Sequence, residues 1–122
     1  MSADGKARAL EAEVRSVDAT RILSITGEID MASAPQFQAA VEQAAQDRPE
    51  VLVVDLSQVE FFGSAGLSVL LVAAESVPAG SLRVVASPPV RRPIEVTGLD
   101  KLLTVFNSLA DALAVEEPRR PA

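Results

Sequence analysis

The sequence contains no cysteine and no histidine among its 122 residues. Without cysteine, no disulfide, thiolate nucleophile or cysteine-ligated zinc site can form. Without histidine, Ser-His-Asp catalysis and most transition-metal sites are excluded. A catalytic site built from carboxylates alone needs a pair of acids at one place. The only candidates, Asp30 and Asp55, are accompanied by nothing that would position a substrate. We therefore expect no enzyme, no metal and no cofactor.

Tryptophan and tyrosine are also absent, there are four phenylalanines, and the formal net charge is −6. Few aromatic side chains are available to stack on bases, and an acidic chain is repelled by a phosphate backbone. The only adjacent basic pairs are Arg91-Arg92 and Arg119-Arg120. We therefore expect no nucleic-acid partner.

Long hydrophobic runs are missing as well. The longest apolar run, Val69 to Ala74, is far shorter than the roughly 18 residues that a membrane-spanning helix needs. The first ten residues lack the apolar core of a signal peptide. These features predict a cytoplasmic protein with no membrane partner. We expect one domain over residues 9–115, with flexible ends at 1–8 and 116–122.

The pattern of apolar residues predicts strands that alternate with helices. Such an order is typical of an α/β domain, here with a mixed, mostly parallel sheet, an antiparallel hairpin at its start and about four helices. The first strand should be half exposed, and the second should end at Gly27. The predicted strands are 10–16, 21–26, 51–56, 82–86 and 104–106, and the predicted helices are 34–46, a second from 64, a third near 90 and a fourth after 107 or 108.

Local signals place the ends of the predicted helices. Ser33, with a glutamine three residues later, has the spacing of a capping box for the first helix. Ser64 is a good N-cap for the second. Because proline fits only the first turn, Pro93 predicts that the third helix begins near Val90. Gly98 is a natural residue to follow its end. The predicted core consists of Phe37, Val41, Val53, Leu67, Leu70, Leu71 and Val84.

The segment from Val51 to Leu71 is the most informative part of the chain. A buried strand ends near Asp55, a loop follows, and Ser64 lies where a helix begins. The free N–H groups at a helix start favour an anion, so a hydroxyl there is a candidate phosphate acceptor. The alternative is that Ser64 acts only as a cap. Asp55 could itself accept phosphate or bind a metal, although hydrogen bonding to the following loop explains it as well.

Three segments together resemble the STAS domain, and most of all the anti-sigma factor antagonists of bacteria. They are GEIDMASAPQF, VVDLSQVEFFGSAGLSVLL and EVTGLDKLL, and the resemblance runs from about Leu10 to Val115. It implies a STAS-like domain that binds an anti-sigma factor with serine-kinase activity and so frees a sigma factor. The kinase phosphorylates a serine at the start of the second helix, which ends the complex, and a phosphatase resets the switch.

The resemblance places Ser64 at the phosphorylated serine, with Gly66-Leu67 matching the residues that follow it. Gly63 stands where many members have aspartate, and Ala65 where a second hydroxyl residue is common. The partner surface implied by the resemblance is made of Gly27, Glu28, Asp30 and Ser33 in one loop, and of Gly63, Ser64, Ala65, Gly66 and Ser68 at the helix start. Glu28 and Asp30 could equally be solvated loop charges. Phe61 and Phe62 cannot easily both point inward, so one should border this surface.

Other functions remain open at this stage. A STAS domain can also be a subunit of a stress-signalling complex or of a lipid transporter, without phosphorylation control. A receiver domain is a weaker alternative, because only Val51 to Asp55 resembles one. The acidic pair and the lysine that a receiver needs are not in place.

Overall fold

The computed structural model describes residues 10–78 and 80–115. The predicted flexible ends, 1–8 and 116–122, lie outside the described residues. In chain order the elements are β1 (Glu11–Val17), β2 (Thr20–Ile29), α1 (Ala34–Ala44), β3 (Val51–Phe62), α2 (Ser64–Ser76), β4 (Leu82–Ala86), α3 (Pro88–Val96), a 3-10 turn (Leu99–Lys101), β5 (Thr104–Phe106) and α4 (Leu109–Ala114). None of the helices in the described ranges is long and apolar enough to span a membrane.

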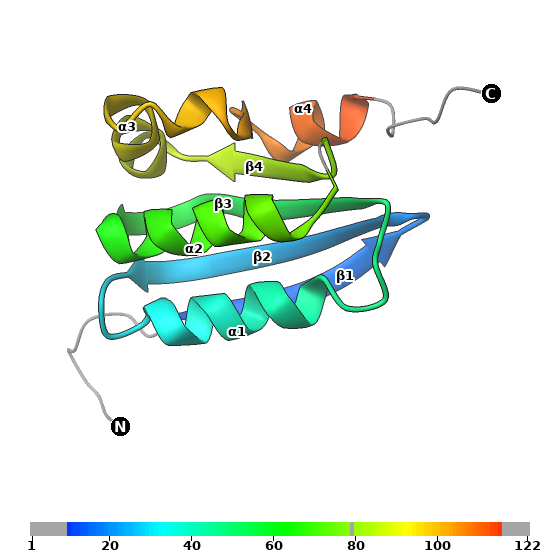
Figure 1. The fold of residues 1–122 in the computed structure, drawn as a ribbon, viewed down its shortest axis with the longest axis horizontal. Helices are drawn as coiled ribbons and strands as arrows, with labels where there is room; N and C mark the ends of the chain where they lie inside the picture. Colours follow the sequence, from blue (N-terminus) through cyan, green and yellow to red (C-terminus); the bar gives the residue numbers. More distant parts are fainter. Residues whose placement is uncertain (1–9, 79, 116–122) are drawn as a thin grey trace.

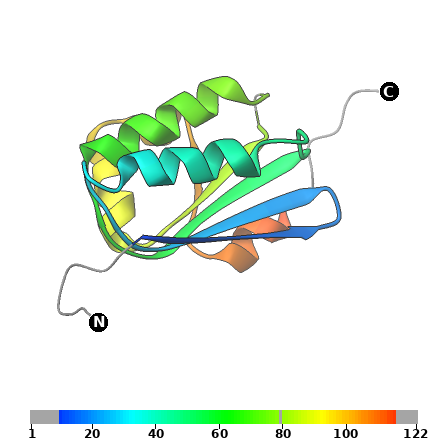
Figure 2. The same ribbon diagram turned by 90° about the horizontal axis from the view of Figure 1, so that it is seen from below.

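The strands form one five-stranded sheet in the order β1-β2-β3-β4-β5. β1 and β2 are antiparallel, and the remaining neighbours are parallel. The first three helices cover one face of the sheet, whereas α4 lies on the other (Figures 1 and 2). The predicted α/β class, the mixed sheet, the opening hairpin and the four helices are confirmed.

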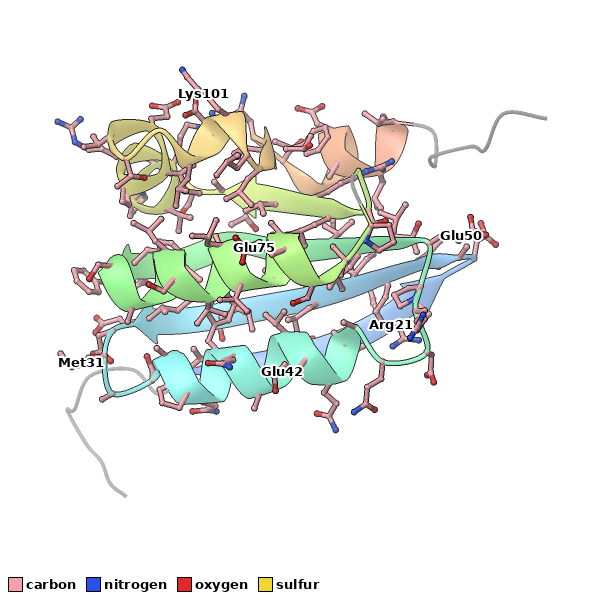
Figure 3. The ribbon with its side chains drawn as sticks, in the orientation of Figure 1. Arg21, Met31, Glu42, Glu50, Glu75 and Lys101 are labelled. Carbon is pink, nitrogen blue, oxygen red and sulfur yellow. The ribbon has the colours of Figure 1, made fainter. Side chains whose placement is uncertain are left out.

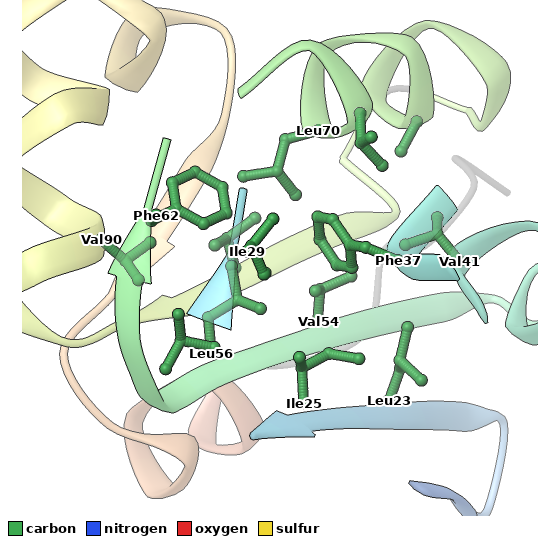
Figure 4. Close-up of a cluster of buried hydrophobic side chains, with 14 of the residues drawn as sticks. Leu23, Ile25, Ile29, Phe37, Val41, Val54, Leu56, Phe62, Leu70 and Val90 are labelled. Carbon is green, nitrogen blue, oxygen red and sulfur yellow. The ribbon is translucent and has the colours of Figure 1, made fainter. Parts of the chain in front are cut away.

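The main core lies between the sheet and the three helices on its first face (Figure 4). Phe37 of α1 and Phe62 of β3 meet there edge to face, with their ring centroids 6.3 Å apart. Six of the seven predicted core residues are buried, but Leu71 is only half-buried. The prediction for Leu71 was wrong. On the buried side of α2, Leu67 and Leu70 are joined by Gly66 and Val69 instead.

β2 and β3 are both longer than their side-chain patterns predict. β2 continues past Gly27 to Ile29, and β3 continues past Leu56 to Phe62. The two strands stay paired by two shifts of register, one of them directly after Gly27, whose φ is 103°. Polar side chains interrupt the apolar pattern, but backbone pairing does not depend on that pattern. The longer strands carry both chain segments to the same end of the sheet.

β1 is more exposed than predicted. All seven of its residues are exposed, although alternation had indicated a half-buried strand. β1 is an edge strand, and α1 contacts β2 more than it contacts β1. Of the predicted strand 10–16, only Leu10, which lies directly before β1, is buried.

Two helix starts also differ from prediction. The side chain of Ser33 makes no capping bond to α1, and Gln36 Nε2 instead donates to the carbonyl oxygen of Leu10, at 3.0 Å. α3 begins at Pro88 and contains Pro93 in its interior. A nine-residue helix loses one hydrogen bond there, which burial of apolar side chains can offset. Gly98 does follow α3 in the left-handed conformation, as predicted.

Candidate functional site

The carboxyl ends of β2 and β3 bring two loops together. Ile29 and Phe62, the last residues of these parallel strands, are register partners. The N–H of Gly63 donates to the carbonyl oxygen of Ile29, with the two atoms 2.9 Å apart. We call the segments 27–33 and 61–68 the carboxyl edge. It contains every residue of the predicted partner surface.

Asp30 and Ser33 organise the loop that precedes α1. Asp30 Oδ1 accepts hydrogen bonds from the N–H groups of Ala32 (3.0 Å) and Ser33 (2.9 Å). Ser33 Oγ donates to the carbonyl oxygen of Glu28 at 2.8 Å and accepts from the N–H of Asp30 at 3.0 Å. The two side chains are therefore engaged within the loop, and their main effect is on its shape.

These hydrogen bonds lower the pKa of the Asp30 carboxyl below its ordinary value, the backbone N–H of Ser33 having the largest effect. A lowered folded pKa gives stability that is present above the unfolded pKa of about 3.9 and is lost as pH falls through the folded pKa. We therefore expect Asp30→Asn to be less stable than wild type near neutral pH. The gap between their free energies of unfolding should narrow in acid. Urea unfolding at several pH values measures the gap. A gap that is constant with pH would contradict this role.

Ser64 is the first residue of α2, not its N-cap as predicted. Gly63 occupies the cap position in an extended conformation, and within the described part of the chain no side chain caps the helix. The side chain of Ser64 is exposed. The first N–H groups of a helix have no partners within it and carry a partial positive charge. A phosphate on Ser64 would lie beside these groups. One turn later, Ser68 is exposed too and its Oγ donates to the carbonyl oxygen of Ser64, at 3.3 Å.

The glycines of the carboxyl edge act on its shape. Gly66 is buried, and a Cβ there would lie 2.7 Å from the Phe62 ring and 2.9 Å from Ile29 Cγ2. Gly27 is also buried, and its φ of 103° is one that L side chains rarely adopt. A Cβ on Gly63 would lie 3.3 Å from the Phe61 ring. Gly66 therefore sets the approach of α2 and Gly27 the path of β2, so both act on the shape of the surface rather than through side-chain contacts.

Two large apolar side chains are exposed at this edge. Met31 is 83% exposed and Phe61 is 51% exposed, whereas Phe62 is 4% exposed and belongs to the core. Met31 projects from the loop between β2 and α1, at the end of the molecule where α2 begins (Figure 3). The prediction that only one of the two phenylalanines points inward is confirmed. Sequence reasoning missed Met31, although a lone apolar residue between polar and small neighbours was a usable signal.

The carboxylate of Asp55 has a local partner. Asp55 Oδ1 accepts a hydrogen bond from the N–H of Ser57 at 3.0 Å, which is the local role expected as its alternative. Across residues 10–78 and 80–115, no three acidic, histidine or cysteine side chains come together in a way that could hold a metal ion. The carboxyl edge thus offers an exposed hydroxyl, a structured loop and two exposed apolar side chains, a combination suited to binding another protein.

Residues 11–112 match the family model of the STAS domain. The chain is 45% identical over 94 residues to the anti-sigma-F factor antagonist RsfB of Mycobacterium tuberculosis, an alignment that covers 75% of this chain and 77% of RsfB. It is also similar to the crystal structure of an anti-sigma factor antagonist from Mycobacterium paratuberculosis. That comparison has a TM-score of 0.82 and 41% identity, and covers 87% of this chain and 92% of the other. Bacillus SpoIIAA in its phosphorylated form shares the fold, with a TM-score of 0.60, 20% identity and coverage of 87% and 97%.

Proposed function

Because the chain belongs to the STAS domain family, we propose that it is an anti-sigma factor antagonist acting in the cytoplasm. It binds an anti-sigma factor and thereby frees a sigma factor for transcription. The similarity to RsfB over three quarters of this chain carries the proposal. The activity is binding, and the chain itself catalyses no reaction.

The carboxyl edge is the proposed binding surface. Binding energy in protein interfaces is concentrated in a few side chains, mostly large ones that a partner removes from water. Met31 and Phe61 are the exposed side chains of this kind at the edge. Glu28, the register partner of Phe61, adds a carboxylate beside them. We expect Met31 and Phe61 to be the apolar anchors and Glu28 to contribute at the rim.

The proposed partner is an anti-sigma factor that is also a serine kinase. The Ser64 hydroxyl attacks the γ-phosphorus of ATP held by the partner. An O–P bond forms, the bond to the bridging oxygen of ADP breaks, and the hydroxyl proton is released. The exposure of Ser64 at the helix start supports this step, because the oxygen is accessible and the product anion faces helix N–H groups. A phosphatase would restore the hydroxyl by hydrolysis.

Release of the sigma factor tests the proposed function directly. The protein serves as bait to capture its anti-sigma factor, which is then purified in complex with its sigma factor. Adding the antagonist should displace sigma and restore transcription from a sigma-dependent promoter. A captured partner that holds no sigma factor, such as a transporter subunit, would overturn the proposal. So would a ternary complex that retains sigma.

Phe61→Ala should weaken binding to the anti-sigma factor by at least about tenfold, because the loss of one buried aromatic anchor costs more than about 1.4 kcal/mol. The matched control is Val115→Ala. Val115 is 48% exposed and directly follows α4. Isothermal titration calorimetry gives both affinities. Equal losses in the two variants, or none in Phe61→Ala, would place the interface elsewhere.

A further inference from the structure

β1 presents an exposed edge on the far side of the sheet from β5. Among the described strands it pairs only with β2, and all seven of its residues are exposed. An edge strand has a row of N–H and C=O groups that point away from its neighbour and can pair with another chain. Val14, at the centre of β1, is 47% exposed. The strand therefore has both backbone groups and an apolar side chain to offer to a partner.

Two opposite charges of β1 flank Val14, and the third charge, Glu11, lies at the end of the strand. Glu13 precedes it and Arg15 follows it, and both project from the face of the sheet opposite to Val14 because side chains alternate along a strand. When two copies of β1 run antiparallel with Val14 opposite the partner's Val14, Glu13 faces the partner's Arg15 and Arg15 faces the partner's Glu13. Opposite charges at directly facing positions stabilise a strand pair, and like charges weaken it.

Other registers bring like charges together. One shift of the pairing by two residues sets Glu13 opposite the partner's Glu13, although Glu11 then faces the partner's Arg15. The opposite shift sets Arg15 opposite the partner's Arg15. A parallel, in-register pair opposes both like charges at once. The charge pattern of β1 therefore favours one arrangement, which has twofold symmetry.

We propose that β1 pairs antiparallel with β1 of a second copy of this chain, so that the two five-stranded sheets join into one. A strand pair with few side-chain contacts buries a small area, so the dimer should be weak, with a Kd of about 10 µM to 1 mM. In Figure 1, β1 runs behind α1, whereas α2 lies over β2 and β3, farther from the β1 edge. The dimer would therefore leave Ser64 accessible, and the inference does not depend on the proposed function.

Charge reversal tests the pairing. Glu13→Arg sets two arginines against each other at each facing pair, and Arg15→Glu sets two glutamates against each other. We expect each single variant to weaken the dimer at least tenfold in sedimentation equilibrium. The double variant Glu13→Arg/Arg15→Glu restores both opposite-charge pairs and should dimerise like wild type. An equimolar mixture of the two single variants should form a heterodimer. Circular dichroism checks that every variant is folded.

Matched controls separate the pairing from net charge. Glu42→Arg on α1 and Glu95→Arg on α3 make the same change of charge as Glu13→Arg at exposed positions outside β1, and both should dimerise like wild type. A wild-type protein that stays monomeric up to millimolar concentration would overturn the proposal. So would a dimer that ignores the single reversals, or one that the double variant does not restore.

Discussion

Phosphorylation of Ser64 is expected to lower the affinity for the anti-sigma factor at least a hundredfold while the domain stays folded. A phosphoserine adds about −1.5 to −2 charges at pH 7. Within the domain this charge is tolerated, because Ser64 is exposed and the start of α2 favours an anion by about 0.3–1 kcal/mol. We expect the effect on binding to have the opposite sign, since a partner bound at the proposed surface would cover the same position.

At the interface the new dianion must lose water, and it meets any acidic side chain of the partner. A hundredfold loss of affinity needs a penalty of only about 2.7 kcal/mol. Burying a poorly paired charge costs several kcal/mol, so the penalty is readily reached. We expect the contacts proposed for Phe61 and Met31 to be too weak to offset this penalty.

Incubation with the cognate kinase and ATP, followed by mass spectrometry, should find phosphate on Ser64. Ser64→Glu should bind the kinase much more weakly than wild type, whereas Ser64→Ala should bind well and resist phosphorylation. Ser68 provides the matched control, since it is an exposed serine one turn further along α2. Phosphate on Ser68 but not on Ser64 would refute the switch. Wild-type affinity of Ser64→Glu would refute it as well.

The second large effect concerns stability. Leu70→Ala is expected to lower the free energy of unfolding by about 2–5 kcal/mol, because it leaves a cavity between α2 and the sheet. Leu70 is fully buried in the main core, near Phe37 and Phe62 (Figure 4). Urea unfolding monitored by circular dichroism measures the change.

Leu71→Ala is the control for this prediction. It removes the same atoms from the adjacent residue, but Leu71 is only half-buried. Leu71→Ala should therefore lower the free energy of unfolding clearly less than Leu70→Ala does. Equal costs would mean that α2 is rotated about its axis relative to the sheet.

Local sequence signals determined the order of the elements and several of their ends. Ser108 caps α4 by accepting a hydrogen bond from the N–H of Asp111, at 3.0 Å. The sequence had predicted either Asn107 or Ser108 as this cap. Gly98 ends α3 in the left-handed conformation. Such ends are set by residues within a few positions of one another, so their chemistry is readable in the sequence. Ser64 was placed at the start of α2 for the same reason, one residue from its true position.

Contacts between distant segments decided what the sequence left undetermined. β2 and β3 extend to Ile29 and Phe62 because their backbones pair with each other. Arg83, read only as part of a strand, is buried and donates hydrogen bonds to the carbonyl oxygens of Ala112 (2.7 Å) and Val115 (3.0 Å), which fixes α4 to the sheet. The rotation of α2, and with it the exposure of Ser64 and the burial of Gly66, depends on the surface of Phe62 and Ile29. Backbone pairing and the fit of one side chain against another need partners that are far away in the chain. The residues of the carboxyl edge could therefore be recognised in the sequence, but only the tertiary structure decided which of them are exposed.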